Sequence, residues 1–184
     1  STMSENALRY RAQRNLLDRD EQMSLLVQRV SGGRWGNWFF PQIAGVGYSF
    51  NPYVWSRYID PQAGMVRLVF GLGTRAVDRS DDDYTRVVAL NDPQRRPDSA
   101  TDQVRQYSQR RVDLIDLEAS HLASRDFADV CLQCGSLPLA KFASRDRELA
   151  AWAAEQKLDE RSALVLTFDE LLTQTPYVAD RREI

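Results

Sequence analysis

The sequence predicts an α+β fold with a mostly antiparallel sheet and flanking helices. Runs of strand-forming residues follow one another through turns, and helical patterns stand mainly toward the two ends of the chain. Strands and helices do not alternate regularly, which argues against a parallel βαβ sheet. At 184 residues of mixed apolar and charged composition, the chain is long enough to bury one ordinary core.

Three helices are expected, each beginning at a hydroxyl side chain that can accept a hydrogen bond from the first turn. Glu170 follows Thr167 by three residues and completes a capping box for the last of them. The expected helices are Glu5–Leu16 after Ser4, residues 144–158 capped by Ser144, and a short helix through Leu171 and Leu172.

The predicted strands are rich in β-branched and aromatic residues and end at glycine, proline or asparagine. Residues 31–42 carry Trp35, Trp38, Phe39 and Phe40 among glycines. We expect a mobile loop that packs on the core or covers a ligand, packing being the commoner fate of such aromatics. The predicted strands are Met23–Val30, Ala44–Phe50, Met65–Gly71, Thr85–Leu90, 110–118 and 163–168.

The charge pattern favours neither a nucleic acid nor a membrane as partner. The formal net charge is -2 and the two signs are interspersed, so no extended basic field is present. No apolar run approaches the roughly 20 residues that span a bilayer, and the N-terminal residues lack a signal-peptide core. We therefore expect a cytoplasmic protein.

Cys131 and Cys134 form a C-x-x-C pair, a spacing that could bind zinc or act as a redox pair. The second pair of ligands that zinc needs is missing, and His121, the one histidine, cannot complete such a site. We expect two small, partly buried thiols and no metal ligand, with His121 at or near the surface.

The stretch VRLVFGLGTRAVDR resembles a dinucleotide fingerprint, because Gly71-Leu72-Gly73 is followed by Ala76 at the required spacing. A dinucleotide site needs this turn to open an amphipathic helix, whose N-terminus holds the pyrophosphate. Only Ala76 and Val77 are apolar before Asp81–Asp83, so a non-helical continuation is expected and the dinucleotide reading is rejected. Two readings stay open: a tight turn with Arg75 in a surface salt bridge, or Arg75 facing an anion.

Several blocks in order resemble the N-terminal nucleotide-binding domain of phosphoenolpyruvate synthase and pyruvate phosphate dikinase. They are RYRAQRN, LLVQRVSG, AGVGYSFNP, VRLVFGLGTRAVD and DDDYTRVVAL, and together they cover Asn6 to Leu90. The resemblance implies part of an ATP-grasp-like subdomain. For the full-length enzyme it implies ATP and Mg²⁺ as ligands and phosphoryl transfer to pyruvate through a histidine on a separate domain.

The resemblance also implies nucleotide contacts. Gln28, Arg29 and Val30 would meet the edge of the adenine, and Gly71, Gly73 and Arg75 would form the glycine turn and its nearest cation. Two positions depart from the family pattern, because Thr74 stands where a glutamate is common and Arg67 or Leu68 where the preceding strand carries an acid.

Residues 1–97 would then be the β-rich part of this domain and residues 98–184 a mixed α/β extension. The essential lysine and arginine and the Mg²⁺ ligands of the family have no counterpart here, so we expect a piece of a larger enzyme, inactive alone. Its partners would be nucleotide and its own remaining domains. The alternatives are a dikinase with another acceptor, such as a glucan or an antibiotic, and a degenerate scaffold without catalysis.

Overall fold

The computed structural model describes residues 3–20, 24–78, 83–97, 100–134, 147–158 and 166–174, in two units, Ser1–Val30 and Ser31–Ile184. The first unit contains helix α1, Glu5–Gln13, which begins at the predicted N-cap. The Ser4 side chain accepts a hydrogen bond from the Ala7 amide at 3.4 Å. The opening helix is confirmed, although it ends at Gln13 and not at Leu16.

The strand predicted at Met23–Val30 is wrong for the described residues 24–30, which have no regular structure. Leu25 and Leu26 are each 82% exposed and Val27 is 92% exposed. β-Forming residues make a strand only when another strand pairs with their backbone, and none of the described strands pairs with this segment. Met23 itself lies outside the described residues.

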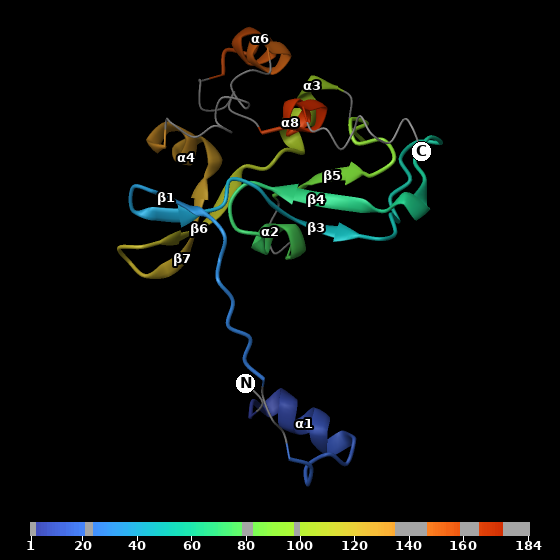
Figure 1. Cartoon of the computed structure of the whole chain (residues 1–184), viewed down its shortest axis with the longest axis vertical. Coiled ribbons are helices and arrows are strands. Elements are labelled where there is room, and N and C mark those ends of the chain that lie inside the picture. Colours follow the sequence, from blue (N-terminus) through green and yellow to red (C-terminus); the bar gives the residue numbers. More distant parts are fainter. Residues whose placement is uncertain are drawn as a thin grey trace. The chain divides into compact units, whose positions relative to one another are not determined.

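Three of the predicted strands form one antiparallel sheet in the second unit, in the order β3-β4-β5. The strands are β3, Ala44–Tyr48; β4, Met65–Val69; and β5, Arg86–Ala89 (Figure 1). The register sets Arg67 opposite Val46 on one side and Val87 on the other. The α+β class with antiparallel sheet is therefore confirmed.

A second antiparallel sheet has the order β1-β2-β6-β7. Its strands are β1, Gly33–Trp35; β2, Trp38–Phe40; β6, Arg111–Asp116; and β7, His121–Asp126. The loop predicted over residues 31–42 is thus wrong, because it folds as a hairpin. Its second strand pairs with β6, where Phe39 lies opposite Ile115, and this distant partner fixes the conformation.

The core gathers three phenylalanines from segments far apart in the chain. Phe40 lies in β2, Phe70 follows β4, and Phe127 begins helix α4, Phe127–Gln133. The rings of Phe40 and Phe70 are 5.5 Å apart and those of Phe70 and Phe127 are 5.4 Å apart, both edge to face. This chain of rings joins the end of the three-stranded sheet to the four-stranded sheet.

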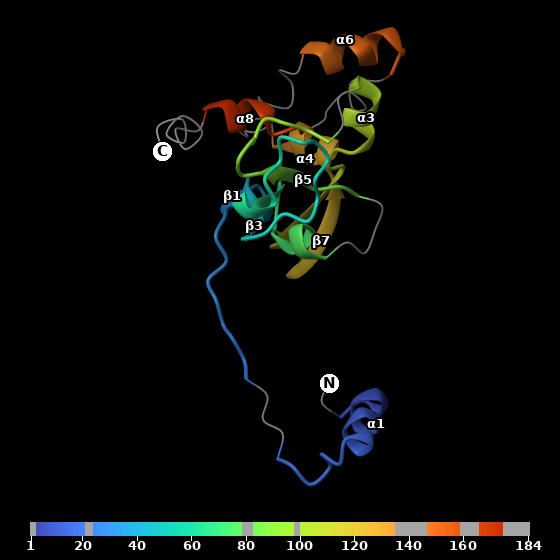
Figure 2. The same cartoon turned by 90° about the vertical axis from the view of Figure 1, so that its right-hand side faces the viewer.

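Short helices complete the second unit: α2, Thr74–Val77; α3, Thr101–Gln106; α6, Arg147–Glu155; and α8, Asp169–Gln174, with a 3-10 turn at Pro61–Ala63. In both views α3 and α8 lie toward β5, and α2 lies on the other side of the sheet (Figures 1 and 2). The helix through Leu171 and Leu172 is confirmed, and α6 confirms the described part of the predicted helix, whose cap Ser144 lies outside the described residues.

Two further expectations are corrected. The predicted strand at 163–168 is reduced to a single bridge between Leu166 and Gln109, and residues 163–165 lie outside the described part. The residues after Gly73 were expected to be non-helical, yet they form the single turn α2. The predicted division between residues 97 and 98 stays a prediction.

Truncation of Phe40 tests the ring chain of the core. Phe40 is fully buried, so Phe40→Ala should lower the free energy of unfolding by about 3–5 kcal/mol through lost burial and a cavity. Phe50, which is 50% exposed, provides the matched control, and Phe50→Ala should cost clearly less. Urea unfolding followed by circular dichroism measures both, and equal losses would contradict the core described above.

Candidate functional site

The glycine turn ends β4 and carries the chain across to the four-stranded sheet. The Gly71 amide donates to the Pro41 carbonyl at 3.1 Å, and the Leu72 amide donates to the Asp113 carbonyl at 2.8 Å. Gly71 has φ +93, and an added Cβ would lie 2.7 Å from both the Asp113 oxygen and Val112 Cγ1. Glycine is required here because strand β6 approaches the turn closely.

Gly73 has a different environment. Its φ is -66, an ordinary right-handed value, and it stands at the N-cap of α2. An added Cβ would make an ordinary contact with the Ala44 side chain at 3.6 Å. Gly71 is therefore the conformationally demanding glycine of the G-L-G turn.

Arg75, the predicted cation of the turn, lies between two carboxylates. Its Nε donates to Asp113 Oδ1 at 2.9 Å, its Nη1 to Asp83 Oδ2 at 3.1 Å, and its Nη2 to Ser124 Oγ at 3.0 Å. The Arg75 side chain is only 12% exposed. The salt bridge that the sequence left open is present, but it is largely buried between the two sheets.

The same cluster accounts for Thr74. Its Oγ1 donates to Asp113 Oδ2 at 2.7 Å, while Asp83 accepts from the Arg110 and Arg111 amides at 2.7 and 2.9 Å. A glutamate at position 74 would bring another negative charge to two carboxylates that share one guanidinium. A hydroxyl donor satisfies Asp113 instead.

Gln28, Arg29 and Val30, the predicted adenine contacts, lie in the other unit, Ser1–Val30. All three are exposed and belong to a segment without regular structure. Gly71, Gly73 and Arg75, by contrast, come together in the second unit at the junction of its sheets.

Gln109 holds the residue before the turn by hydrogen bonds, and the sequence did not predict this role. Its Oε1 accepts from the Phe70 amide at 2.7 Å, and its Nε2 donates to the carbonyls of Phe70 and Arg111 at 2.8 and 2.7 Å. Gln109 is 3% exposed, so its amide serves as a buried strand partner for Phe70. No sequence pattern distinguishes this glutamine from a surface glutamine.

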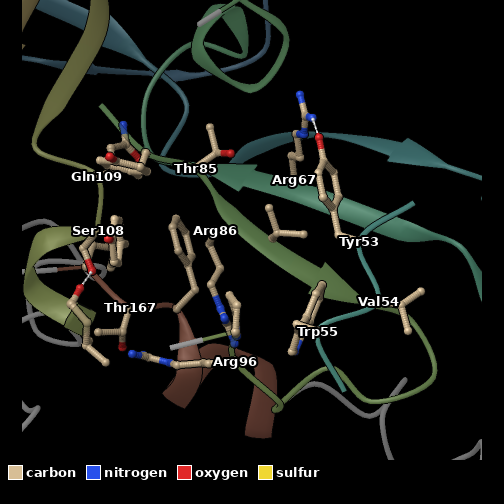
Figure 3. Close-up of a pocket in the computed structure, with 17 residues that line it drawn as sticks. Tyr53, Val54, Trp55, Arg67, Thr85, Arg86, Arg96, Ser108, Gln109 and Thr167 are labelled. Carbon is tan, nitrogen blue, oxygen red and sulfur yellow. Dashed lines mark hydrogen bonds between the residues drawn. The ribbon is translucent and has the colours of Figure 1, made fainter. Parts of the chain in front are cut away.

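A pocket of about 490 Å³ lies beside β4 and β5, and Gln109 forms part of its wall. Arg67, Arg86 and Arg96 line it (Figure 3). Its other walls are largely apolar and include the aromatic side chains of Tyr53, Trp55, Tyr84, Tyr107 and Phe168. The sequence reasoning missed this site because its three arginines come from separate segments that only the fold brings together.

The charges around this pocket are unbalanced. Asp169, at the start of α8, accepts from Arg86 at 3.2 Å and also pairs with Arg96. Arg67 donates to the Tyr53 hydroxyl at 3.2 Å and stacks over the Tyr48 ring at 5.4 Å. Asp169 thus pairs with two of the three guanidiniums, whereas Arg67 contacts a tyrosine hydroxyl and a tyrosine ring.

The two cysteines are free thiols, as predicted, and both are buried, more so than the partial burial expected. Burial, with smaller contributions from Cys134 and Asp126, raises the pKa of Cys131 to about 12, and burial also raises the pKa of Cys134. Both are therefore protonated and poorly nucleophilic at neutral pH. In the described part of the chain no group of three or more His, Cys, Asp or Glu side chains could hold a metal, and His121 is exposed at the start of β7.

The family model described as pyruvate phosphate dikinase, AMP/ATP-binding domain, matches residues 1–137. The chain belongs to this family. Neither a curated protein nor a solved structure matches the chain. The match confirms the resemblance found in the sequence and makes the chain an AMP/ATP-binding domain of kinase-like phosphotransferase lineage. Among the residues described for this dikinase-family chain, no helix is long and apolar enough to cross a membrane.

Alanine at Gly71 tests whether the turn of this dikinase-family domain is fixed by packing as well as by conformation. Gly36 is the matched control, because it also has positive φ, +61, but has nothing within 4 Å of an added Cβ. Gly36→Ala should cost about 1–2 kcal/mol from conformation alone, and Gly71→Ala roughly 1–3 kcal/mol more from overpacking against β6. Thermal unfolding measures the difference, and equal costs would contradict a packed junction.

Proposed function

We propose that this chain is part of the ATP-binding domain of an enzyme that converts pyruvate to phosphoenolpyruvate through a phosphohistidine. The observation that carries the proposal is the family match over residues 1–137, which spans both the glycine turn and the LLVQRV segment. Mg²⁺, an ATP-grasp arrangement and a separate phosphohistidine domain belong to this proposal, since the resemblance implies them.

The nucleotide would meet Gln28, Arg29 and Val30 at the edge of its adenine, where a flat apolar slot with backbone donors and acceptors suits the base. The geometry favours an indirect role for Gly71 and Arg75, in which they stabilise the site without contacting the nucleotide. The bare face of Gly71 is occupied by β6, and Arg75 would have to leave two carboxylates to reach a phosphate. We therefore propose that they hold the wall of the nucleotide site in place, together with the half-buried Gly73.

Two alternative functions each have a specific ground. Acceptor choice depends on domains outside these residues, so a dikinase acting on a glucan or an antibiotic fits the same wall. A degenerate scaffold is favoured by Arg67 and Thr74, which stand where relatives keep acids and which are engaged here by Tyr53 and Asp113. Nucleotide binding separates this last alternative from the other two.

Val30 provides a direct test of the adenine contact in the whole protein. Val30→Asp should weaken Mg-ATP binding by about tenfold or more, because a charge in an apolar slot is costly to desolvate. Val27→Asp is the matched control, since Val27 lies in the same segment, is 92% exposed and is not a proposed contact. Calorimetry with Mg-ATP measures the affinities.

The reaction itself is tested by phosphoenolpyruvate formation from pyruvate and Mg-ATP, which should require all three components. Tight Mg-ATP binding without turnover of pyruvate would point to another acceptor. Absence of nucleotide binding by the whole protein would contradict the proposal and leave the scaffold alternative.

A further inference from the structure

The pocket lined by Arg67, Arg86 and Arg96, here called the arginine pocket, is separate from the glycine turn. None of Gly71, Gly73 and Arg75 lines it. Its volume of about 490 Å³ lies within the range of pockets that hold small organic ligands, roughly 300–1,000 Å³. It therefore has the size of a ligand site that the proposed nucleotide contacts do not explain.

The charge of the arginine pocket selects for anions. The described residues that line it include three arginines and no acidic side chain, and Asp169 pairs with both Arg86 and Arg96. Among the described residues, the Arg67 guanidinium has a hydroxyl and a ring as partners but no carboxylate. Arginine presents a planar fork of donors that matches a carboxylate or a phosphate, so an anionic group beside Arg67 would restore the balance.

The remaining walls select for a flat apolar body. Tyr84 and Tyr107 meet edge to face at 5.0 Å, and Phe168 and Trp55 add apolar surface. Trp55 also offers a hydrogen-bond donor, because its Nε1 is buried without a hydrogen-bond partner. A buried donor in this state is satisfied when a ligand supplies an acceptor.

We propose that the arginine pocket binds a small aromatic carboxylate or aryl phosphate, with its anionic group near Arg67 and its ring among the aromatic side chains. The lining shares no residue with the proposed nucleotide contacts, and we expect the ligand to bind without ATP. Gln109 lines the pocket and also hydrogen-bonds to Phe70, the residue before Gly71. A ligand in contact with Gln109 would therefore be linked to the glycine turn through this side chain.

Calorimetry of the whole protein with phenyl phosphate tests the ligand class. Inorganic phosphate carries the charge without the ring, and benzyl alcohol carries a ring without the charge. Phenyl phosphate should bind saturably and at least about tenfold more tightly than either, since both halves of the pocket contribute. Equal affinity for phenyl phosphate and inorganic phosphate would overturn the proposal.

Arg67→Gln tests the position of the anion. It should weaken phenyl phosphate binding by about tenfold or more, as expected when a charge-assisted hydrogen bond is lost. Arg57→Gln is the matched control, because Arg57 also donates to a tyrosine hydroxyl, at 2.6 Å, and stacks on a tyrosine ring, at 4.8 Å, but does not line the pocket. Equal affinities of the two variants would contradict the assignment.

Two further measurements keep the test independent of folding and of the proposed function. Trp55→Phe keeps the apolar surface and removes only the Nε1 donor, so it should fold normally and bind phenyl phosphate more weakly than the unchanged protein. Saturating Mg-ATP should leave the phenyl phosphate affinity unchanged. Displacement by Mg-ATP would overturn a separate site, whereas a protein that binds phenyl phosphate but not ATP would contradict only the proposed function.

Discussion

The guanidinium of Arg75 connects the two sheets of the second unit. It reaches Asp113 on β6 from one side of the junction and Asp83, just before β5, from another. Asp83 in turn accepts the two amides that lead into β6. A buried charge is tolerated only when it is paired and hydrogen-bonded. The Arg75 side chain can therefore be buried only together with Asp83 and Asp113. The turn at Gly71 and the entry to β6 are thereby fixed relative to each other.

This constraint changes the functional meaning of the glycine turn. Bare glycines after a strand suggest a place where a ligand approaches, yet the open side of Gly71 is filled by the backbone of β6. Under the proposed function the turn would support the nucleotide site, where positioning dominates phosphoryl transfer. The Arg75 cluster provides rigidity at the cost of leaving no free charge on Arg75, and it gives a physical reason for Thr74, whose hydroxyl serves Asp113.

Local patterns predicted those elements whose side chains and partners lie close together in the sequence. β3, β4 and β5 are stretches of strand-forming residues bounded by turn residues and pair with their neighbours along the chain, and α1 carries its own cap at Ser4. The hairpin of β1 and β2 was missed because its partner, β6, lies far along the chain and its aromatics resemble a loop. The strand predicted at residues 24–30 failed for the opposite reason, since a strand-forming composition without a partner does not fold into a sheet.

In the candidate site, too, the contiguous residues were predictable and the partners from distant segments were not. Gly71 and Arg75 were predicted from the contiguous G-L-G turn, and their role in the site stays a prediction. Their partners Asp83, Asp113 and Gln109 were not predicted, since a single aspartate or glutamine gives no signal of burial. The arginine pocket was also missed, because its charge arises only when β4, β5 and residue Arg96 meet in space.

A double-mutant cycle between Arg75 and Asp113 tests the junction most directly. The free energies of unfolding of Arg75→Met, Asp113→Asn and the double variant are compared with that of the unchanged protein. If the cluster joins the sheets, the double variant should be less destabilised than the sum of the single variants by roughly 1–3 kcal/mol. Additivity within about 0.5 kcal/mol would show that the two side chains act independently and would contradict the account.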